Sequence, residues 1–388
     1  MFSDYLNQNL SFDAITKERQ AQLLRISQSR GRQILVYAAD INKSSAPISI
    51  DYSDIIPFND QLSNLNGTAV DVILETPGGD GTVAEDMVRL LRGRFQEVAF
   101  IIPGWAKSAG TIIAMSGDEI LMGPASALGP IDAQLFWQGK VFSAEALLEG
   151  MNKIKQEVVD TGMLNKAYIP ILQNISPGEL QSAQNSLDFA RRLVTDWLAT
   201  YKFKNWAIHR SSTKQPVTPQ EKKDRAKVIA DDLCSHQKWL SHGRSIKIDD
   251  LRTMRLEITD FTGNAELGDA ITRYHTLLQM TFATNVYKVF ETSTSQIYRL
   301  FAQQGNAAQQ GQQQLPQNAT NVIITTNCPK CGAVGQIQAN LGVAQPLQPG
   351  NIPFPPDNKY RCATCGMEQD LTAVRQQVEG QTGKKIVA

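Results

Sequence analysis

The feature that most constrains this fold is an alternation of short apolar runs with a helix-period segment in the first third of the chain. Four β-branched runs have the length and composition of strands, at residues 33–38, 48–52, 69–74 and 98–102. Between the last two runs, apolar side chains repeat at helical spacing: Val83, Met87, Leu90 and Leu91. Strands that alternate with helices predict right-handed βαβ units in a parallel sheet.

From about residue 143 the periodicity is helical. The apolar positions of two helices are Leu147, Met151, Ile154 and Val158, then Leu180, Ala183, Leu187, Ala190, Val194 and Tyr201. Residues 211–220 are predicted to form a loop, and a last amphipathic helix is predicted to carry Val286, Phe290, Ile297 and Phe301. We therefore expect a helical segment (1–30), an α/β domain (31–302), a Gln/Asn/Gly-rich flexible linker (303–321) and a cysteine module (322–388).

Charge and hydropathy exclude several classes of partner. Lys+Arg and Asp+Glu number 38 each, so balanced charge gives no case for DNA or an acidic membrane as the main partner. The N-terminus lacks the basic start and apolar run of a secretory signal. No stretch approaches the roughly 18 apolar residues of a membrane span. We expect a cytoplasmic protein.

Three glycine-rich turns follow predicted strands and carry the candidate chemistry. They are Leu74–Gly79 (Leu-Glu-Thr-Pro-Gly-Gly), Pro103–Thr111 (Pro-Gly-Trp-Ala-Lys-Ser-Ala-Gly-Thr) and Met122–Asp132. Ser108 lies between a strand and the apolar helix Thr111–Met115, and a sharp turn there would expose its hydroxyl as a nucleophile. Glycines at 78 and 79 let backbone N–H groups approach a substrate. With the N–H of Ala109 they are candidate oxyanion-hole donors, each worth ~3–4 kcal/mol in other hydrolases.

Taken singly, each motif has a simpler explanation. A serine before Ala-Gly-Thr is commonly a helix N-cap, and Pro-Gly-Gly is commonly a plain turn. Together, however, the three turns resemble the Clp-fold serine proteases, specifically the serine dehydrogenase proteinase group, which is related to signal peptide peptidase A and the Clp proteolytic subunit. The resemblance covers roughly residues 30–260 and is strongest over 69–135. The stretch Lys238–Asp249 also resembles the group.

The resemblance implies an α/β, Clp/crotonase-like spiral of ββα units and peptide hydrolysis. It also implies Ser108 as nucleophile, with Gly78, Gly79 and Ala109 as oxyanion donors. Relatives commonly assemble into rings or stacks, so a homo-oligomer acting on a peptide or protein substrate is expected.

The sequence does not identify the general base. The resemblance places a histidine of Clp relatives near Pro130–Asp132 and a lysine of dyad relatives near Ala146–Leu148, and this chain has neither. The remaining candidates are Lys140, Lys153 and His242, with Asp132 as an orienting carboxylate or a simple loop cap. His242 is favoured because an imidazole of pKa ~6.5 suits proton transfer at neutral pH, and its alternative role is that of a surface or capping histidine. Lys107, beside Ser108, is interpreted as solvated or as an oligomer contact.

The five cysteines divide into two pairs and a single residue. Cys328/Cys331 and Cys362/Cys365 are Cys-x-x-Cys-Gly knuckles separated by a 30-residue spacer (332–361). Two such turns predict a four-thiolate structural zinc ribbon, whose folding depends on the metal and which binds a protein or nucleic acid. The alternatives are a redox pair or chance. Cys234 is predicted to be a buried core thiol.

Three functions are compatible with the sequence. The first is a serine peptidase. The second is a catalytically inactive crotonase-fold scaffold that binds partners through the zinc ribbon. The third, weaker one is an acyl-CoA enzyme, because that chemistry also uses paired backbone N–H groups.

Overall fold

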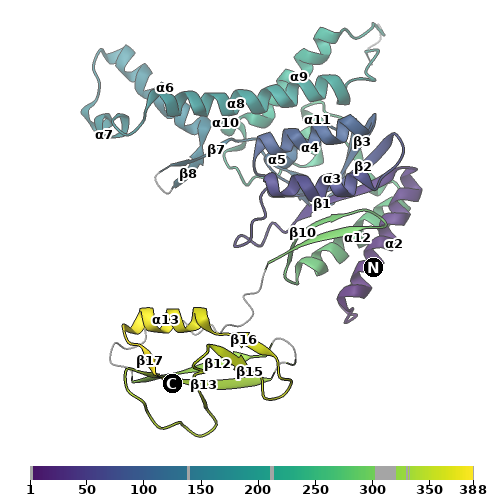
Figure 1. Ribbon diagram of the computed structural model, residues 1–388. Coiled ribbons are helices and arrows are strands. Elements are labelled where there is room, and N and C mark those ends of the chain that lie inside the picture. The colour runs from purple at the N-terminus through teal and green to yellow at the C-terminus, as the bar shows by residue number, and fades with distance from the viewer. Residues whose placement is uncertain are drawn as a thin grey trace. The chain divides into compact units, whose positions relative to one another are not determined.

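The computed structural model describes residues 3–137, 140–209, 214–301, 320–328, 331 and 333–387. The chain divides into two compact units, Met1–Phe301 and Ala302–Ala388 (Figure 1). The predicted linker falls mostly outside the described residues, as do residues 211–213 of the predicted loop.

The first unit is built on a seven-stranded sheet of order β11-β10-β1-β2-β3-β5-β9. Its strands are β1 (Gln33–Ala39), β2 (Ala69–Glu75), β3 (Glu97–Ile102), β5 (Glu119–Met122), β9 (Thr259–Asp260), β10 (Val286–Glu291) and β11 (Gln296–Leu300). The run from β1 to β9 is parallel, whereas β10 and β11 are antiparallel additions. The predicted parallel sheet of βαβ units is therefore present.

Helices cover both faces of this sheet, which explains the nearly continuous apolar strands. One face, carrying Ile34 and Val36, packs on α2 (Phe12–Arg30) and α12 (Ala265–Phe282). The other face, carrying Leu35 and Tyr37, packs on five helices: α3 (Ile55–Ser63), α4 (Gly81–Arg94), α5 (Ala109–Ala114), α8 (Pro177–Trp197) and α9 (Pro219–Cys234). The turns that follow β2 and β3 open onto this second face.

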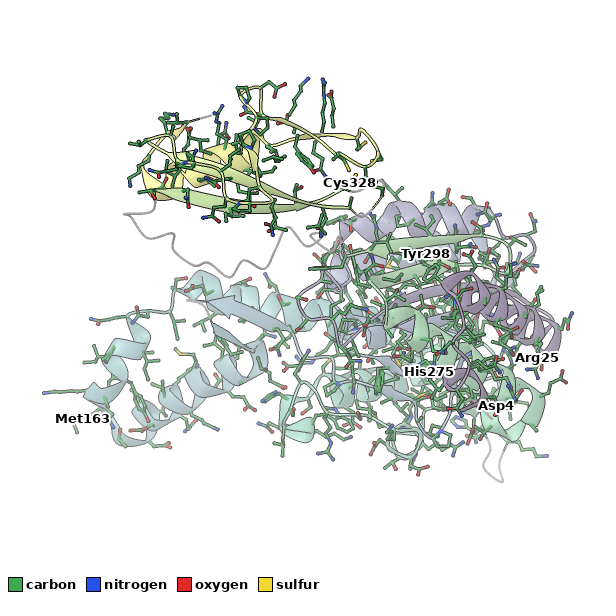
Figure 2. The ribbon with its side chains drawn as sticks, turned by 90° about the horizontal axis from the view of Figure 1, so that it is seen from below. Asp4, Arg25, Met163, His275, Tyr298 and Cys328 are labelled. Atoms are coloured by element: carbon green, nitrogen blue, oxygen red, sulfur yellow. The ribbon has the colours of Figure 1, made fainter. Side chains whose placement is uncertain are left out.

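A helical arm extends from the second layer of helices (Figure 1). It consists of α6 (Ala144–Thr161), α7 (Ile169–Leu172) and the first half of α8. From residue 145 to residue 182 every side chain is exposed or half-buried. Met163, which is 75% exposed, marks the tip of the arm in Figure 2.

Short elements complete the first unit. They are α1 (Ser3–Leu6), η1 (Tyr52–Asp54), β4 (Trp105–Ala106), β6 (Ala127–Leu128), β7 (Gln134–Trp137), β8 (Lys140–Ser143), η2 (Lys166–Tyr168), the π-turn η3 (Leu198–Lys202), α10 (His236–Trp239), α11 (Ile248–Thr253) and η4 (Phe261–Gly263). The strand β4 pairs with β6 and leads directly into Ser108.

Two sequence predictions are wrong. Residues 286–301 form the antiparallel pair β10 and β11 instead of an amphipathic helix. The spacing of Val286 and Phe290 fits a helix, but the segment is rich in β-branched and aromatic residues and is interrupted by the turn after Glu291. The expected strand at 48–52 contributes only a single bridge, Ile50 to Gly79, before the 3₁₀ turn η1.

The second unit holds a four-stranded sheet made of β12 (Asn321–Asn327), β13 (Val334–Leu341), β14 (Ile352–Pro353) and β17 (Ile386–Val387). It also has the hairpin β15 (Lys359–Arg361) and β16 (Glu368–Asp370), and helix α13 (Thr372–Thr382). Cys328 and Cys362 are part of its small core, together with Ile337, Phe354 and Tyr360.

Among the described residues, no helix is both long and apolar enough to cross a membrane.

Candidate active site and metal centre

Ser108 lies in a strained turn between β4 and α5. Its backbone has φ 50° and ψ −115°, a left-handed conformation that is unusual for a residue with a side chain. The start of the turn is bound to Thr76, the residue after β2, because Thr76 N–H donates to Trp105 O (2.8 Å) and Lys107 N–H donates to Thr76 O (3.0 Å). Ser108 is half-buried and accessible, as its expected role as nucleophile requires.

The diglycine bend lies directly against this turn. Gly78 has φ 99° and Gly79 has φ 151°, both in the range that favours glycine. A Cβ on Gly78 would lie 2.7 Å from Ser108 Cβ and 3.1 Å from Ala109 N. A Cβ on Gly79 would lie 2.4 Å from the backbone of Ile50. The close approach of these two turns therefore depends on glycine at both positions.

The segment around Ile50 holds the bend in place. Ile50 N–H donates to Gly78 O (2.8 Å), and Asp80 N–H donates to Ile50 O (2.9 Å). This segment is in turn anchored by the buried ammonium of Lys288, which donates to Ser49 O (2.7 Å) and to the carboxylate of Asp54 (2.8 Å). Asp80 then caps the first turn of α4.

The N–H groups of the bend are not equivalent. Gly78 N–H donates to Thr76 Oγ1 at 3.1 Å, so it is already engaged. Within the described part of the chain, the N–H groups of Gly79 and Ala109 have no hydrogen-bond acceptor. Of the three predicted oxyanion donors, Gly79 and Ala109 are therefore the two with a free N–H.

A cleft of about 550 Å³ opens in front of Ser108. Six of the predicted site residues line it: Gly78, Gly79, Ser108, Ala109, Asp132 and His242. Part of its wall is apolar and comes from Ile112, Ile131, Phe189 and Ala190. Residues from distant parts of the sequence thus meet in one cavity large enough for a short stretch of substrate.

Asp132 is buried, at 2% exposure, in the loop between β6 and β7. Ile131 N–H donates to Leu233 O (2.9 Å), which brings this loop against the end of α9. The Asp132 carboxylate accepts hydrogen bonds from Ser143 Oγ (2.6 Å) and Gln134 Nε2 (2.9 Å). Asp132 is thus embedded in a polar network within the cleft wall.

Two histidines approach the same carboxylate oxygen. Asp132 Oδ2 lies 3.3 Å from His236 Nδ1 and 3.9 Å from His242 Nδ1. Only the second of these histidines lines the cleft with Ser108. Sequence reasoning assigned nothing to His236. The one available signal was its position two residues before the stretch Lys238–Asp249, which resembles the family.

The environment of His242 favours its neutral form. Burial lowers the pKa of His242, the negative charge of Asp132 opposes this, and the positive charge of Lys107 adds to the lowering. Its buried Nδ1 has no hydrogen-bond partner among the described residues. A neutral imidazole is the form that can accept a proton from a serine hydroxyl.

Among the described side chains, no lysine candidate is placed to act as the general base. Lys153 is exposed on α6 and does not line the cleft, and the side chain of Lys140 lies outside the described residues. The interpretation of Lys107 as solvated is wrong, because this residue is only 8% exposed and its ammonium is surrounded by oxygen acceptors. Burial, followed by the charge of Lys247, lowers the pKa of Lys107 to about 8.

The remaining histidines pair elsewhere. His209 lies 3.1 Å from Glu221, and His275 lies 2.9 Å from Glu75 on the opposite face of the sheet. Figure 2 labels His275 near Arg25 and Asp4, on the side formed by α1, α2 and α12. Cys234 is buried as predicted, and burial raises the pKa of its thiol to about 12.

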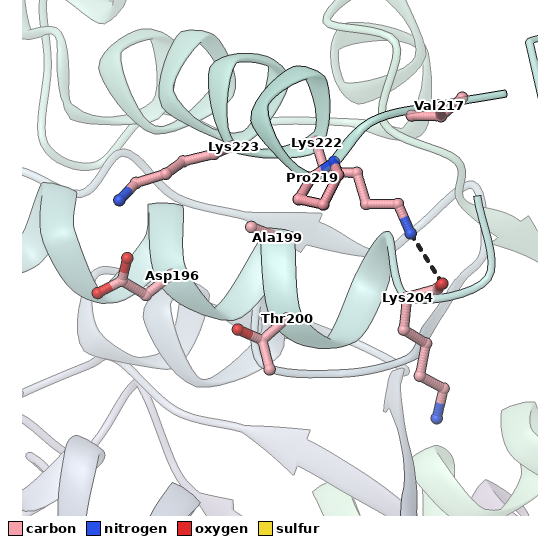
Figure 3. Close-up of a pocket in the computed structure, with 8 residues that line it drawn as sticks. All are labelled: Asp196, Ala199, Thr200, Lys204, Val217, Pro219, Lys222 and Lys223. Carbon is pink, nitrogen blue, oxygen red and sulfur yellow. Dashed lines mark hydrogen bonds between the residues drawn. The ribbon is translucent and has the colours of Figure 1, made fainter. Parts of the chain in front are cut away.

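A larger hollow of about 720 Å³ lies between η3, the end of α8 and the start of α9 (Figure 3). Its polar lining comes from Asp196, Thr200, Lys204, Lys222 and Lys223. The ammonium of Lys222 donates to the carbonyl of Lys204 (2.9 Å). Among the described residues that line this hollow there is no serine, cysteine or histidine, so its size does not make it the candidate active site.

The second unit gathers its four cysteines at one point. The sulfur atoms of Cys328, Cys331, Cys362 and Cys365 all lie within 4.8 Å of one another, with closest pairs at 3.4 and 3.6 Å. These separations exceed the S–S bond length of about 2.05 Å. They approach the value of about 3.8 Å between sulfurs around a tetrahedral zinc with Zn–S bonds of about 2.3 Å.

The knuckle geometry supports thiolate ligation. Backbone N–H groups of Cys365 and then Thr364 lower the pKa of the Cys362 thiol to about 6. For the Cys365 thiol, the lowering by the N–H of Met367 is outweighed by the neighbouring thiols, Cys328 first, and its pKa is raised to about 12. Gly366 has φ 71°, the left-handed conformation that the turn after the second knuckle needs. The four residues can therefore hold a metal ion.

Comparison with known proteins agrees with this geometry. Residues 14–177 match the family of ClpP-like SDH-type serine proteinases. This match confirms the resemblance expected from the three glycine-rich turns: the segment is similar to ClpP-like serine proteinases. The matched segment contains Ser108 and Asp132, whereas His236 and His242 lie beyond it.

Two curated relatives are uncharacterized proteins of Methanocaldococcus jannaschii. MJ0137 is 28% identical over 159 residues, which are 40% of this chain and 51% of the relative. MJ1495 is 32% identical over 95 residues, which are 24% of this chain and 31% of the relative. The chain thus spans about half the length of the first relative and less of the second.

Among solved structures, a serine-to-alanine mutant of the 1510-N membrane-bound stomatin-specific protease is similar at a TM-score of 0.31 and 15% identity. That match covers 54% of this chain and 74% of the other.

Proposed function

We propose that this protein is a serine peptidase that cleaves peptide bonds through an acyl-enzyme on Ser108. The observation that carries the proposal is the meeting of Ser108, two unengaged N–H groups and a neutral histidine in one cleft. The family match supports the peptidase class.

The residues suit the successive steps of acyl transfer. His242 accepts the proton of the Ser108 hydroxyl as the serine oxygen attacks the substrate carbonyl carbon. The negative oxygen that develops is bound by the N–H groups of Gly79 and Ala109. The protonated His242 then donates its proton to the departing amine. Water, activated by the same imidazole, hydrolyses the ester.

Asp132 is proposed to orient His242. At 3.9 Å the two groups are beyond hydrogen-bond distance, so the imidazole must move by about 1 Å toward Asp132 when substrate binds. Catalytic hydrogen bonds are commonly long without substrate and tighten in the complex. Lys153 is too exposed to act as a base without a rearrangement of α6, so His242 is the base we propose.

We also propose the finer features that the resemblance implies. These are a crotonase-like spiral within the α/β unit, self-association into a homo-oligomer, and a cytoplasmic location, where a reducing environment keeps four thiols available to metal. Peptides or proteins are the proposed substrates.

For the second unit we propose a structural zinc ribbon. Cys328, Cys331, Cys362 and Cys365 would hold the ion, and zinc bound there would supply folding energy to a unit with a small core. The proposed role of this unit is to bind a protein or nucleic acid.

One observation favours a second function, an inactive scaffold. Asp132 already accepts from Ser143 and Gln134, and His236 is closer to it than His242. If this network persists when substrate binds, no carboxylate orients His242. Ser108 then lacks an activated base.

A fluorophosphonate probe distinguishes these two functions. We expect wild-type protein to be labelled, Ser108→Ala to remain unlabelled, and His242→Ala to be labelled at least about 100-fold more slowly. His209→Ala is the matched control, because His209 pairs with Glu221 at the surface, away from the cleft. Correctly folded wild-type protein that resists every such probe would favour the scaffold.

A further inference from the structure

The side chain of Lys107 crosses from the serine turn to the segment that carries His242. Its ammonium lies 3.0 Å from Arg244 O, 3.1 Å from Ser245 Oγ, 3.3 Å from Leu128 O and 3.5 Å from Gly243 O. All four partners are oxygen atoms that can accept. An ammonium has three N–H donors and no acceptor, so this environment suits the charged form of lysine.

Both ends of this connection are fixed. The Lys107 backbone is bound to the end of β2, because its N–H donates to Thr76 O. Its alkyl stem packs on Gly129, where a Cβ would lie 2.6 Å from Lys107 Cδ. The side chain therefore has one path, and that path ends at residues 243–245.

Besides Lys107, the segment near His242 is held by Arg244, whose N–H donates to Ser241 O (3.2 Å) and whose guanidinium lies 5.9 Å from the centre of the Trp239 ring. Leu128 and Ile246 exchange two backbone hydrogen bonds of 3.0 and 2.9 Å, which fix the C-terminal end of the segment. Residues 243–245 are exposed, and the ammonium of Lys107 binds the carbonyls of Gly243 and Arg244. Without this ammonium, the two residues that follow His242 lose their shared buried donor.

We propose that Lys107 is a positioning residue that holds the His242 segment against the turn carrying Ser108. The proposal deepens the proposed peptidase function and rests on it for its catalytic consequence. The tether itself is a separate physical claim. Lys107 does not act as the general base, because its ammonium is occupied by carbonyl oxygens and a hydroxyl.

The tether also predicts a response to alkaline pH. Two charged or titratable groups face Lys107: Lys247, which precedes α11, and His242. Because burial and Lys247 lower its pKa to about 8, Lys107 loses its proton above that pH and then has only two donors and one lone pair facing carbonyl oxygens. Protection of the His242 segment should therefore fall between about pH 7 and pH 9.

The test is amide hydrogen exchange over residues 240–247, measured with probe labelling on the full chain. We expect Lys107→Met to accelerate exchange in this segment about tenfold and to slow labelling by at least that factor. Ser245→Ala, which removes one acceptor and leaves the lysine, should give a smaller change in the same direction. Lys238→Met is the matched control, since the exposed Lys238 pairs through its ammonium with Asp232 (2.9 Å) and the variant should leave both readouts unchanged.

Lys107→Arg provides the readout that a purely structural role would not move. Arginine stays charged at all accessible pH values, so we expect the alkaline loss of protection and of labelling to disappear in this variant. If Lys107 variants do not fold, wild-type protein alone decides the matter. Exchange over 240–247, corrected for intrinsic rates, must rise between pH 7 and pH 9.

Unchanged exchange in folded Lys107→Met, or in wild-type protein across this pH range, overturns the tether. If wild-type protein is never labelled but exchange responds as expected, the peptidase proposal fails and the tether stands.

Discussion

Gly78 and Ser108 are so close that a Cβ on the glycine would stand 2.7 Å from the Cβ of the serine. Two carbon atoms from separate parts of the chain cannot pack at that distance, so a Cβ at position 78 would force one of the two turns to shift. The contact joins the turn after β2 to the turn before α5, and so defines the floor of the cleft.

Gly78→Ala should therefore abolish probe labelling. The added methyl group both clashes with Ser108 and forces a side chain into φ 99°, a strain of about 1–3 kcal/mol. We expect a lower melting temperature and displacement of the Ser108 turn. Gly150→Ala is the control: Gly150 lies inside α6 with no atom within 4 Å of a new Cβ, so that variant should be neutral or slightly more stable. Normal labelling of Gly78→Ala would show that the two turns are not coupled.

Asp132→Asn should slow labelling by about 100-fold without loss of fold, because an amide cannot stabilise the imidazolium that forms on His242. His236→Ala gives a contrasting outcome. It removes the closer histidine from Asp132 Oδ2, so labelling should stay the same or become faster. If labelling is lost in His236→Ala but retained in His242→Ala, then His236 and not His242 is the general base.

Labelling should fall at acid pH with a midpoint below 6.5. Burial lowers the pKa of His242, so the folded protein keeps the neutral base to a lower pH than a free imidazole would. The lowered pKa of His242 also makes the free energy of unfolding depend on pH. The unfolded chain takes up a proton first, so this group costs stability as pH falls from about 6.5 through the folded pKa and has no effect above 6.5. Titration of the His242 ring by NMR measures this directly, and a midpoint above 6.5 would contradict the assigned environment.

Removal of metal should unfold the second unit and spare the cleft. We expect one zinc per chain by native mass spectrometry, lost in Cys362→Ser, with faster proteolysis after Phe301 when a chelator is added. Cys234→Ala is the control for a buried thiol outside the cluster and should retain zinc. Labelling of Ser108 should not change on chelation. Full protease resistance of the metal-free second unit would show that its core suffices without the ion.

Hydrophobic runs and glycine positions in the sequence predicted strands β2 and β3, but not the strands that depend on pairing with distant residues. The runs at 69–74 and 98–102 are apolar on both faces except at Asp71 and are flanked by glycines, so β2 and β3 and the two turns at their ends were predictable. The helix expected at 286–301 failed because Val286 and Phe290 satisfy a helical period by chance, while pairing with β1 decides the structure.

The candidate site was predictable only where chemistry follows directly from a strand. Ser108 and the diglycine bend follow β3 and β2, and the cysteine knuckles have a distinctive spacing. His236 and the buried position of Lys107 were not predictable, because both depend on the return of residues 233–246 to the serine turn across more than a hundred positions.

The central claim is that Ser108 forms an acyl-enzyme, and pre-steady-state hydrolysis of an activated ester tests it most directly. The account predicts a burst of leaving group equal to the concentration of active chains, an acyl adduct that maps to Ser108 by mass spectrometry, and neither in Ser108→Ala. Folded wild-type protein that shows no burst, or a burst that persists in Ser108→Ala, would contradict it.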